Sequence, residues 1–176
     1  MGRKKYRYTM GIDPSGAFHE GKGTTGWCVL DNRTNTLLRV DTISAKDYDT
    51  AEEYWQAHID QIKWVHRHYK CLAISIEDYI LYKTSAMAQV NSQLETVQLL
   101  GIIKHYCYFN NLRYFIRPAV AVKTRWSDKI LLHKGIIGKT GSRYTVPGSR
   151  QTICEHERDS IRHAIHFNTF ENKEVN

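Results

Sequence analysis

The order in which strand-like and helix-like hydrophobic patterns follow one another along the chain is the feature that most limits its fold. Short apolar runs typical of β-strands occupy residues 6–12, 26–31 and 36–43, with Gly-rich and Asn-rich turns between them. Residues 51–69 then carry apolar side chains at helical spacing. The first third of the chain therefore predicts a three-stranded antiparallel meander followed by one long amphipathic helix.

The second part repeats the alternation of strand and helix. Residues 72–78 (LAISIED) and 112–117 (LRYFIR) are typical of strands, and residues 85–109 between them of a long helix. A helix that connects two strands of one sheet makes those strands parallel. With a last helix near 154–170, the order βββαβαβα predicts an α/β fold, with a mixed five-stranded sheet flanked by helices.

The pattern weakens over residues 119–152. Residues 119–136 are compatible with one helix or two, and both interpretations remain open. The remainder of the segment is polar, basic and rich in glycine, and it predicts a mobile loop.

Composition limits the class of protein and its partners. The 176 residues suffice for one domain with its own core, so we expect residues 1–176 to form a single domain. The 41% apolar and 24% charged residues exclude a disordered or fibrous chain. The net charge of +7 favours a polyanionic partner such as nucleic acid over an acidic small molecule.

The cysteines and the hydropathy indicate the compartment. Four cysteines are scattered without a CxxC pair. This favours small buried side chains in a reducing compartment over a disulfide framework or a zinc site. No run approaches the roughly 18 apolar residues of a membrane span. We expect a cytoplasmic protein with no membrane partner.

Acidic residues stand where strands end. Asp13 closes the first strand before Pro14, and Glu77 closes the strand 72–78, while His156 and Asp159 share one face of the last helix. If the two strands are neighbours, the carboxylates converge at the sheet edge where open α/β sheets bind ligands. Converging carboxylates repel unless a proton or a cation relieves them, and hard oxygen ligands suit Mg²⁺. The set predicts metal-assisted hydrolysis of a phosphodiester.

Each of these residues also has a simpler interpretation. Asp13-Pro14-Ser15-Gly16 is a favourable turn sequence, and Glu77 is compatible with a solvated strand end. Asp159 complements a helix dipole, and a lone histidine such as His156 is more often structural than a ligand. The acids nevertheless fall on strand, strand and late helix in that order, and this combination favours the site.

These residues carry a resemblance to a known family. GIDPSG followed by TTGWCVL, then ISIEDYILYK and HERDSIRHAIHF, resemble the first strand, second acidic strand and closing helix of the RuvC-type Holliday junction resolvases, over nearly the whole chain. The small size resembles the phage branch of this family, which has an RNase H-like fold. The resemblance implies metal-binding acids at Asp13, Glu77 and Asp159, with His156 as a fourth member.

The resemblance also implies partners and cofactors. A homodimer would bind branched DNA at a four-way junction and nick two strands symmetrically, with two Mg²⁺ or Mn²⁺ ions per site. The apolar stripe of the helix 85–109 is a candidate dimer interface, although packing on its own sheet explains that stripe equally well. Two segments depart from the family pattern: the connection 17–23 is longer, and residues 134–152 lack the expected sequence.

Basic and aromatic residues near the predicted site are candidates for DNA contact. Cations of this kind position a duplex without reading its sequence. A tyrosine among them is suited either to stacking on an unpaired base or to packing beside a strand. The candidates are Tyr82, Lys83, Lys123, Arg125 and Lys129.

Other functions remain open from sequence alone. The same metal chemistry serves RNase H-like nucleases that act on forks, flaps or RNA–DNA hybrids. DPSG followed by GTTG is also loosely similar to the phosphate-binding hairpin of actin-like ATPases, but the chain is short for two such lobes and has no second Gly-rich phosphate loop. A junction-binding module without catalysis is the third alternative, and the intact acid set argues against it.

Overall fold

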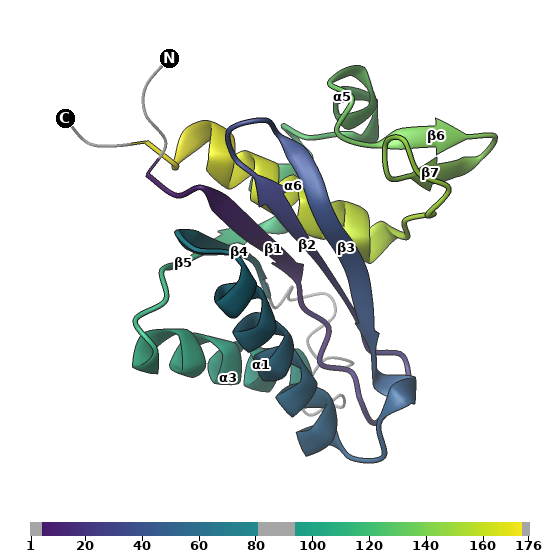
Figure 1. The fold of residues 1–176 in the computed structure, drawn as a ribbon. Helices are drawn as coiled ribbons and strands as arrows, with labels where there is room; N and C mark the ends of the chain where they lie inside the picture. The colour runs from purple at the N-terminus through teal and green to yellow at the C-terminus, as the bar shows by residue number, and fades with distance from the viewer. Residues whose placement is uncertain (1–4, 81–93, 174–176) are drawn as a thin grey trace.

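The computed structural model describes residues 5–80 and 94–173. Five strands form one mixed sheet in the order β3-β2-β1-β4-β5 (Figure 1). β1 pairs antiparallel with β2, and β2 with β3, whereas β1 and β4 are parallel, as are β4 and β5. The predicted class is thereby confirmed. The strands are β1 (Tyr8–Asp13), β2 (Thr24–Asp31), β3 (Thr36–Ser44), β4 (Leu72–Asp78) and β5 (Tyr114–Pro118).

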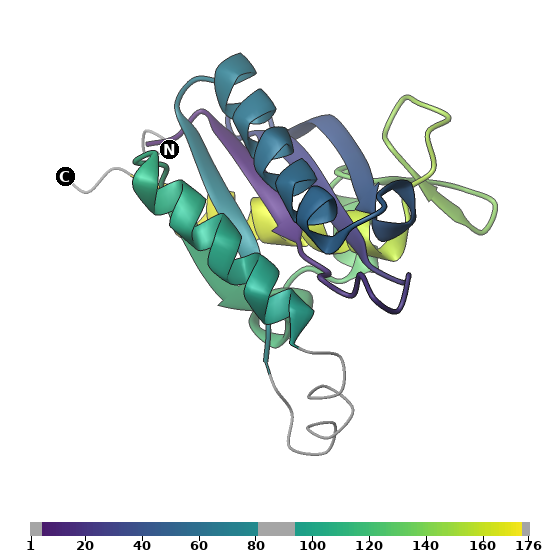
Figure 2. The same ribbon diagram turned by 90° about the horizontal axis from the view of Figure 1, so that it is seen from below.

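Helices cover both faces of this sheet. α1 (Ala51–His68) and α3 (Glu95–Phe109) lie on one face, and α6 (Glu155–Phe170) crosses the other (Figures 1 and 2). A short 3₁₀ turn, η1 (Ala45–Asp47), leads into α1. α1 begins with a capping box, in which the Thr50 side chain accepts from Glu53 N–H and the Glu53 carboxylate accepts from Thr50 N–H.

Alternation along the strands sorts side chains between two cores. Met10 and Ile12 of β1 belong to the core against α1 and α3. The residues between and after them, Gly11 and Asp13, face α6, because successive strand residues point to opposite faces. β4 follows the same rule: Ile76 faces α1 and α3, and the flanking Ser75 and Glu77 contact α6. The strand ends thus present both acids to the same helix.

The helix predicted over 85–109 is described from Glu95 onward, and residues 85–93 lie outside the described part of the chain. In the described part the apolar stripe packs on the protein's own sheet through Leu99, Leu100 and Ile103. Tyr108 and Phe109 at its C-terminal end remain 78% and 77% exposed.

The loop predicted for the polar part of residues 119–152 contains regular structure instead. Residues 134–152 include a hairpin of β6 (Gly138–Thr140) and β7 (Arg143–Thr145), which is preceded by two short helices, α4 (Ala119–Lys123) and α5 (Asp128–His133). Three-residue strands are too short to show readable alternation, and the Gly-rich sequence that suggested mobility instead supplies the turns. Ile136 and Ile137 anchor the start of the hairpin in the core on the α6 face.

The four cysteines divide into two buried and two exposed. Cys28 and Cys107 are buried as expected, but Cys71 and Cys154 are exposed, because Cys71 lies in the turn before β4 and Cys154 at the N-cap of α6. In the part of the chain that the structure describes, no helix is both long and apolar enough to cross a membrane.

The connection 17–23 is folded rather than a free hairpin tip. Gly23 N–H donates to the Ala17 carbonyl, and the Phe18 ring packs against the core. His19 pairs with Glu95 in the first turn of α3, both through its ring and through its backbone N–H. The extra residues therefore join the β1–β2 connection to α3.

Candidate active site

Two glycines let α6 lie directly on the sheet. A Cβ at Gly11 would stand 2.0 Å from the Ser160 carbonyl oxygen, and one at Gly26 would stand 2.2 Å from the His156 carbonyl carbon and oxygen. Both positions therefore exclude any side chain. On β4, the Ser75 hydroxyl donates to the His163 carbonyl at 3.0 Å. α6 thus crosses β2, β1 and β4 in turn, which brings its inward face over the strand ends.

The packing of α6 on the sheet brings His156 into contact with Asp13. Asp13 Oδ2 lies 2.8 Å from His156 Nδ1, and Asp13 is only 8% exposed. Burial raises the pKa of Asp13; the hydrogen bond from His156 opposes this shift, and the charges of Glu77 and Asp159 add to it. The hydrogen bond to Asp13 in turn raises the pKa of His156, although burial opposes that shift.

Glu77 pairs with a second histidine of the same helix. His163 Nε2 lies 3.1 Å from Glu77 Oε2, and His163 is 1% exposed. Its other ring nitrogen, Nδ1, is buried without a hydrogen-bond partner in the described residues. Since only Nε2 meets an acceptor, the ring donates from that atom and fixes the orientation of the Glu77 carboxylate.

Asp159 is held by two cations. It is 3% exposed, its Oδ2 lies 2.7 Å from Lys123 Nζ, and its Oδ1 accepts from the Arg162 guanidinium. The same guanidinium donates to Asp128 and, through Nε, to the Trp126 carbonyl at 2.9 Å. Arg162 therefore joins Asp159 to α5 and to the loop before it.

The three acids act together on Lys123. Burial lowers the pKa of its ammonium, but the hydrogen bond with Asp159 and the charges of Glu77, Asp159 and Asp13 outweigh burial and raise it. One ammonium is thus stabilised by all three carboxylates. A nearby cation of this kind offsets the repulsion among converging acids, two of which, Asp13 and Asp159, are buried.

This arrangement bears on whether the residues fit a metal ion. Within residues 5–80 and 94–173, no three His, Cys, Asp or Glu side chains stand close enough together to hold an ion as they are. The donor types still suit a hard divalent cation, and the Lys123 ammonium already provides a positive charge among the same three acids. The residues fit a metal by chemistry and charge.

The predicted DNA contacts divide into three groups. Lys123 is engaged with Asp159 and so belongs to the acid cluster. Arg125 stacks its guanidinium 5.0 Å from the centre of the Phe170 ring, and Lys129 is exposed on α5. Tyr82 and Lys83 lie outside the described residues.

Sequence reasoning missed the partners of the acids. His163 is on the same helical face as His156, but nothing local indicated that it pairs with Glu77. The three-residue spacing of Asp159 and Arg162 was a readable signal for their ion pair. The pairing of Arg162 with Asp128, 34 residues away, had no local signal.

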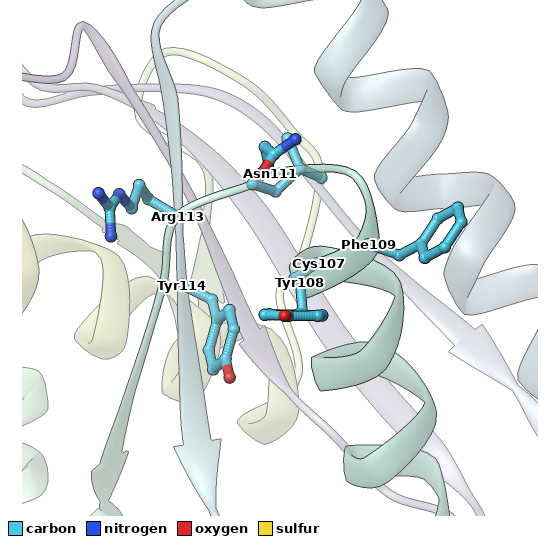
Figure 3. A pocket seen from close by; sticks show the side chains of 7 residues that line it. Cys107, Tyr108, Phe109, Asn111, Arg113 and Tyr114 are labelled. Atoms are coloured by element: carbon cyan, nitrogen blue, oxygen red, sulfur yellow. The ribbon is translucent and has the colours of Figure 1, made fainter.

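One surface hollow of the described residues lies away from the acids. This hollow of about 760 Å³ lies at the turn between α3 and β5, lined by aromatic and polar side chains that include Tyr108, Asn111 and Arg113 (Figure 3). β5 begins at this turn, whereas Glu77 pairs with Arg117 near the other end of β5. We assign the candidate site from the converging charges, because no acid lines this hollow.

Comparison with known proteins identifies the fold. No protein-family model and no curated protein sequence matches the chain. Among solved structures, T. thermophilus RuvC in complex with a Holliday junction substrate is similar at a TM-score of 0.65 and 15% identity, over 96% of this chain and 99% of that one. A further Thermus thermophilus RuvC structure is similar at a TM-score of 0.62 and 14% identity, over 95% of this chain and 98% of that one. The chain has the fold of RuvC, and the resemblance seen in the sequence is confirmed at that level.

Proposed function

We propose that this protein is a metal-dependent, structure-selective endodeoxyribonuclease that resolves four-way DNA junctions by paired nicking. The observation that carries the proposal is that one helix, α6, meets both strand-end acids and carries the third. Its His156 contacts Asp13 at 2.8 Å, its His163 contacts Glu77 at 3.1 Å, and its Asp159 pairs with Lys123 at 2.7 Å. The fold shared with a RuvC whose structure contains a Holliday junction substrate supports it. We further propose that residues 1–176 act as a single nuclease domain in the cytoplasm.

Asp13, Glu77, Asp159 and His156 would hold the metal, which we propose to be two Mg²⁺ ions per site, with Mn²⁺ accepted. The metal would supply a charged clamp on the phosphodiester and lower the pKa of a bound water. The chain's own residues orient the acids: His163 fixes Glu77, and Arg162 fixes Asp159. Lys123 offsets the repulsion among the carboxylates, so that the site folds with its acids together.

A homodimer matches the proposed substrate. A four-way junction has near two-fold symmetry and must be cut at two paired points, so two sites related by a two-fold axis suit it. α3 stays our candidate interface, and the exposed Tyr108 and Phe109 at its end support that choice. Sedimentation with a bound junction should give two chains per junction. A single chain bound per junction would refute the paired-nicking mechanism but not the proposal that the protein is a nuclease.

The structure weighs against the actin-like alternative. Gly26, which lies in the GTTG motif, packs against the His156 backbone of α6, so it does not form an open phosphate-binding turn. A nuclease that acts on forks, flaps or RNA–DNA hybrids would use the same chemistry. Only a comparison of cutting rates on these substrates distinguishes it from a junction resolvase.

The decisive experiment compares substrates and acid variants. Wild-type protein with Mg²⁺ should cut a synthetic four-way junction faster than duplex, fork, flap or RNA–DNA hybrid controls. Asp13→Asn, Glu77→Gln and Asp159→Asn should each abolish cutting and retain junction affinity, because binding depends on cations elsewhere. Glu52→Gln, an exposed acid of α1, is the matched control and should cut normally. Near wild-type cutting by all three site variants would show that the site is assigned wrongly.

A further inference from the structure

The hairpin of β6 and β7 carries charge of one sign. Residues 134–152 contain Lys134, Lys139, Arg143 and Arg150 and no acid. All four cations are exposed. The hairpin projects from the body of the molecule in both ribbon views, beyond the β3 side of the sheet (Figures 1 and 2). A projecting segment with such a charge excess attracts a polyanion.

The projection is firmly attached. The Gln151 side-chain amide donates to the Val40 carbonyl of β3 at 2.8 Å, and Ile153 N–H donates to the Tyr144 carbonyl at 2.9 Å. Ile136, Ile137 and Ile153 are buried in the core beneath α6. The apolar residues at the base of the hairpin are therefore used for anchoring, and its tip consists of small polar residues.

A stack of side chains joins the hairpin to the turn of α6 that carries the site. The Arg158 guanidinium lies 4.4 Å from the centre of the Tyr144 ring, and Lys139 Nζ lies 5.5 Å from it. Arg158 also pairs with Asp128 of α5 at 3.2 Å, and it immediately precedes Asp159. The hairpin is thus fixed relative to His156 and Asp159.

The ladder places cations on both faces of the hairpin. Lys139 stands opposite Tyr144, and Thr140 opposite Arg143. Directly opposite residues share a face and neighbouring residues alternate, so Lys139 and Arg143 project to opposite sides. A ribbon with a cation on each face is suited to contacting phosphates on either side of it, without reading bases.

We propose that this hairpin is a phosphate-binding arm, which holds one duplex arm of the branched DNA at a fixed distance from the acid cluster. The inference rests on the proposed function, because the partner it commits to is that DNA. A membrane surface fits less well, since Ile136 and Ile137 are buried at the base of the segment and Tyr144 and Val146 pack against the same core. The turn between β6 and β7, Gly141-Ser142, has no apolar side chain to insert.

The test removes three charges at a time. Lys139→Gln/Arg143→Gln/Arg150→Gln is compared with Arg67→Gln/Lys70→Gln/Arg113→Gln, which lowers the net charge equally at exposed positions before β4 and β5, toward the sheet edge opposite β3 and the hairpin. Binding to a four-way junction and to linear duplex is measured by fluorescence anisotropy over a salt series, without divalent metal, so that no DNA is cut.

The hairpin variant should bind the DNA roughly 10- to 100-fold more weakly at 0.1 M salt, and the slope of log affinity against log salt should fall by about two to three. The control should change affinity by no more than about threefold. Single variants Arg143→Gln and Arg150→Gln, each expected to lower the slope by about one, keep the test valid should the triple variant fold poorly.

Wild-type binding and slope in the hairpin variants would overturn the proposal, as would an equal loss in the control. A loss of binding to anionic lipid vesicles with DNA binding intact would assign the hairpin to a membrane surface instead. These results are independent of the nuclease proposal, because Asp13→Asn tests cutting and leaves the hairpin unchanged. A protein that cuts none of the substrates but binds DNA through the hairpin would refute only the nuclease proposal.

Discussion

Gly26→Ala is the sharpest test of how α6 assembles the site. The new Cβ would lie 2.2 Å from the His156 carbonyl group, whereas an ordinary contact begins near 3.4 Å. The obstacle is helix backbone, which cannot rotate aside as a side chain can. To restore an ordinary contact distance, the start of α6 must move away from β2 by about 1.2 Å, the difference between 3.4 and 2.2 Å. His156 then moves away from Asp13 together with the helix.

A displacement of this size should cost about 100-fold in cutting rate, since about 1 Å of misplacement costs that much in a positioned site. Overpacking should also lower the free energy of unfolding by about 1 to 3 kcal/mol. Junction affinity should change little.

Single-turnover cleavage, anisotropy and urea unfolding measure the three effects of Gly26→Ala. Gly101→Ala is the matched control, because its Cβ would meet nothing within 4 Å in the exposed middle of α3. Gly101→Ala should cut DNA at the wild-type rate, and its free energy of unfolding should rise by about 0.5 to 1 kcal/mol. Wild-type cutting and stability in Gly26→Ala would refute the close packing of α6 on β2.

Two further predictions concern histidines. Burial lowers the pKa of His58 to about 4 from 6.5, so the unfolded chain takes up a proton below pH 6.5 that the folded one refuses. Between pH 7.5 and 5.0, the free energy of unfolding in urea should therefore fall by about 2 kcal/mol more for wild type than for His58→Gln. An equal fall in the two proteins would contradict the buried neutral ring. His156→Asp should lower the ratio of Mn²⁺ to Mg²⁺ activity, because imidazole is the softer ligand; an unchanged ratio would exclude His156 from metal contact.

The sheet was predictable because its strands and helices are long enough for their periodicity to be read. The positions of Asp13 and Glu77 followed too, since each acid interrupts an apolar strand at its end. Each lies one residue beyond Ile12 and Ile76, the last two residues that β1 and β4 pair with each other. Parallel pairing then placed them together without further information.

The partners of these acids were not predictable, because they arise from tertiary packing. His163 reaches Glu77 only because α6 crosses β4 at Ser75, and Lys123 reaches Asp159 from a helix of five residues. The hairpin was missed for a different reason. Glycine marks turns in ordered and mobile segments alike, and the buried Ile136 and Ile137 that distinguish this segment lie at its start, outside its polar part.

The position of α6 in the chain also sets when the site is completed during synthesis. Asp13 and Glu77 belong to strands that can pair once β4 has emerged, but His156 and Asp159 arrive with the last helix. At ordinary rates of translation, the interval between Glu77 and Glu155 is on the order of ten seconds. A nascent or truncated chain that lacks α6 has its two strand-end acids uncovered and lacks the third, so the acid cluster is present only in molecules whose sheet is already built.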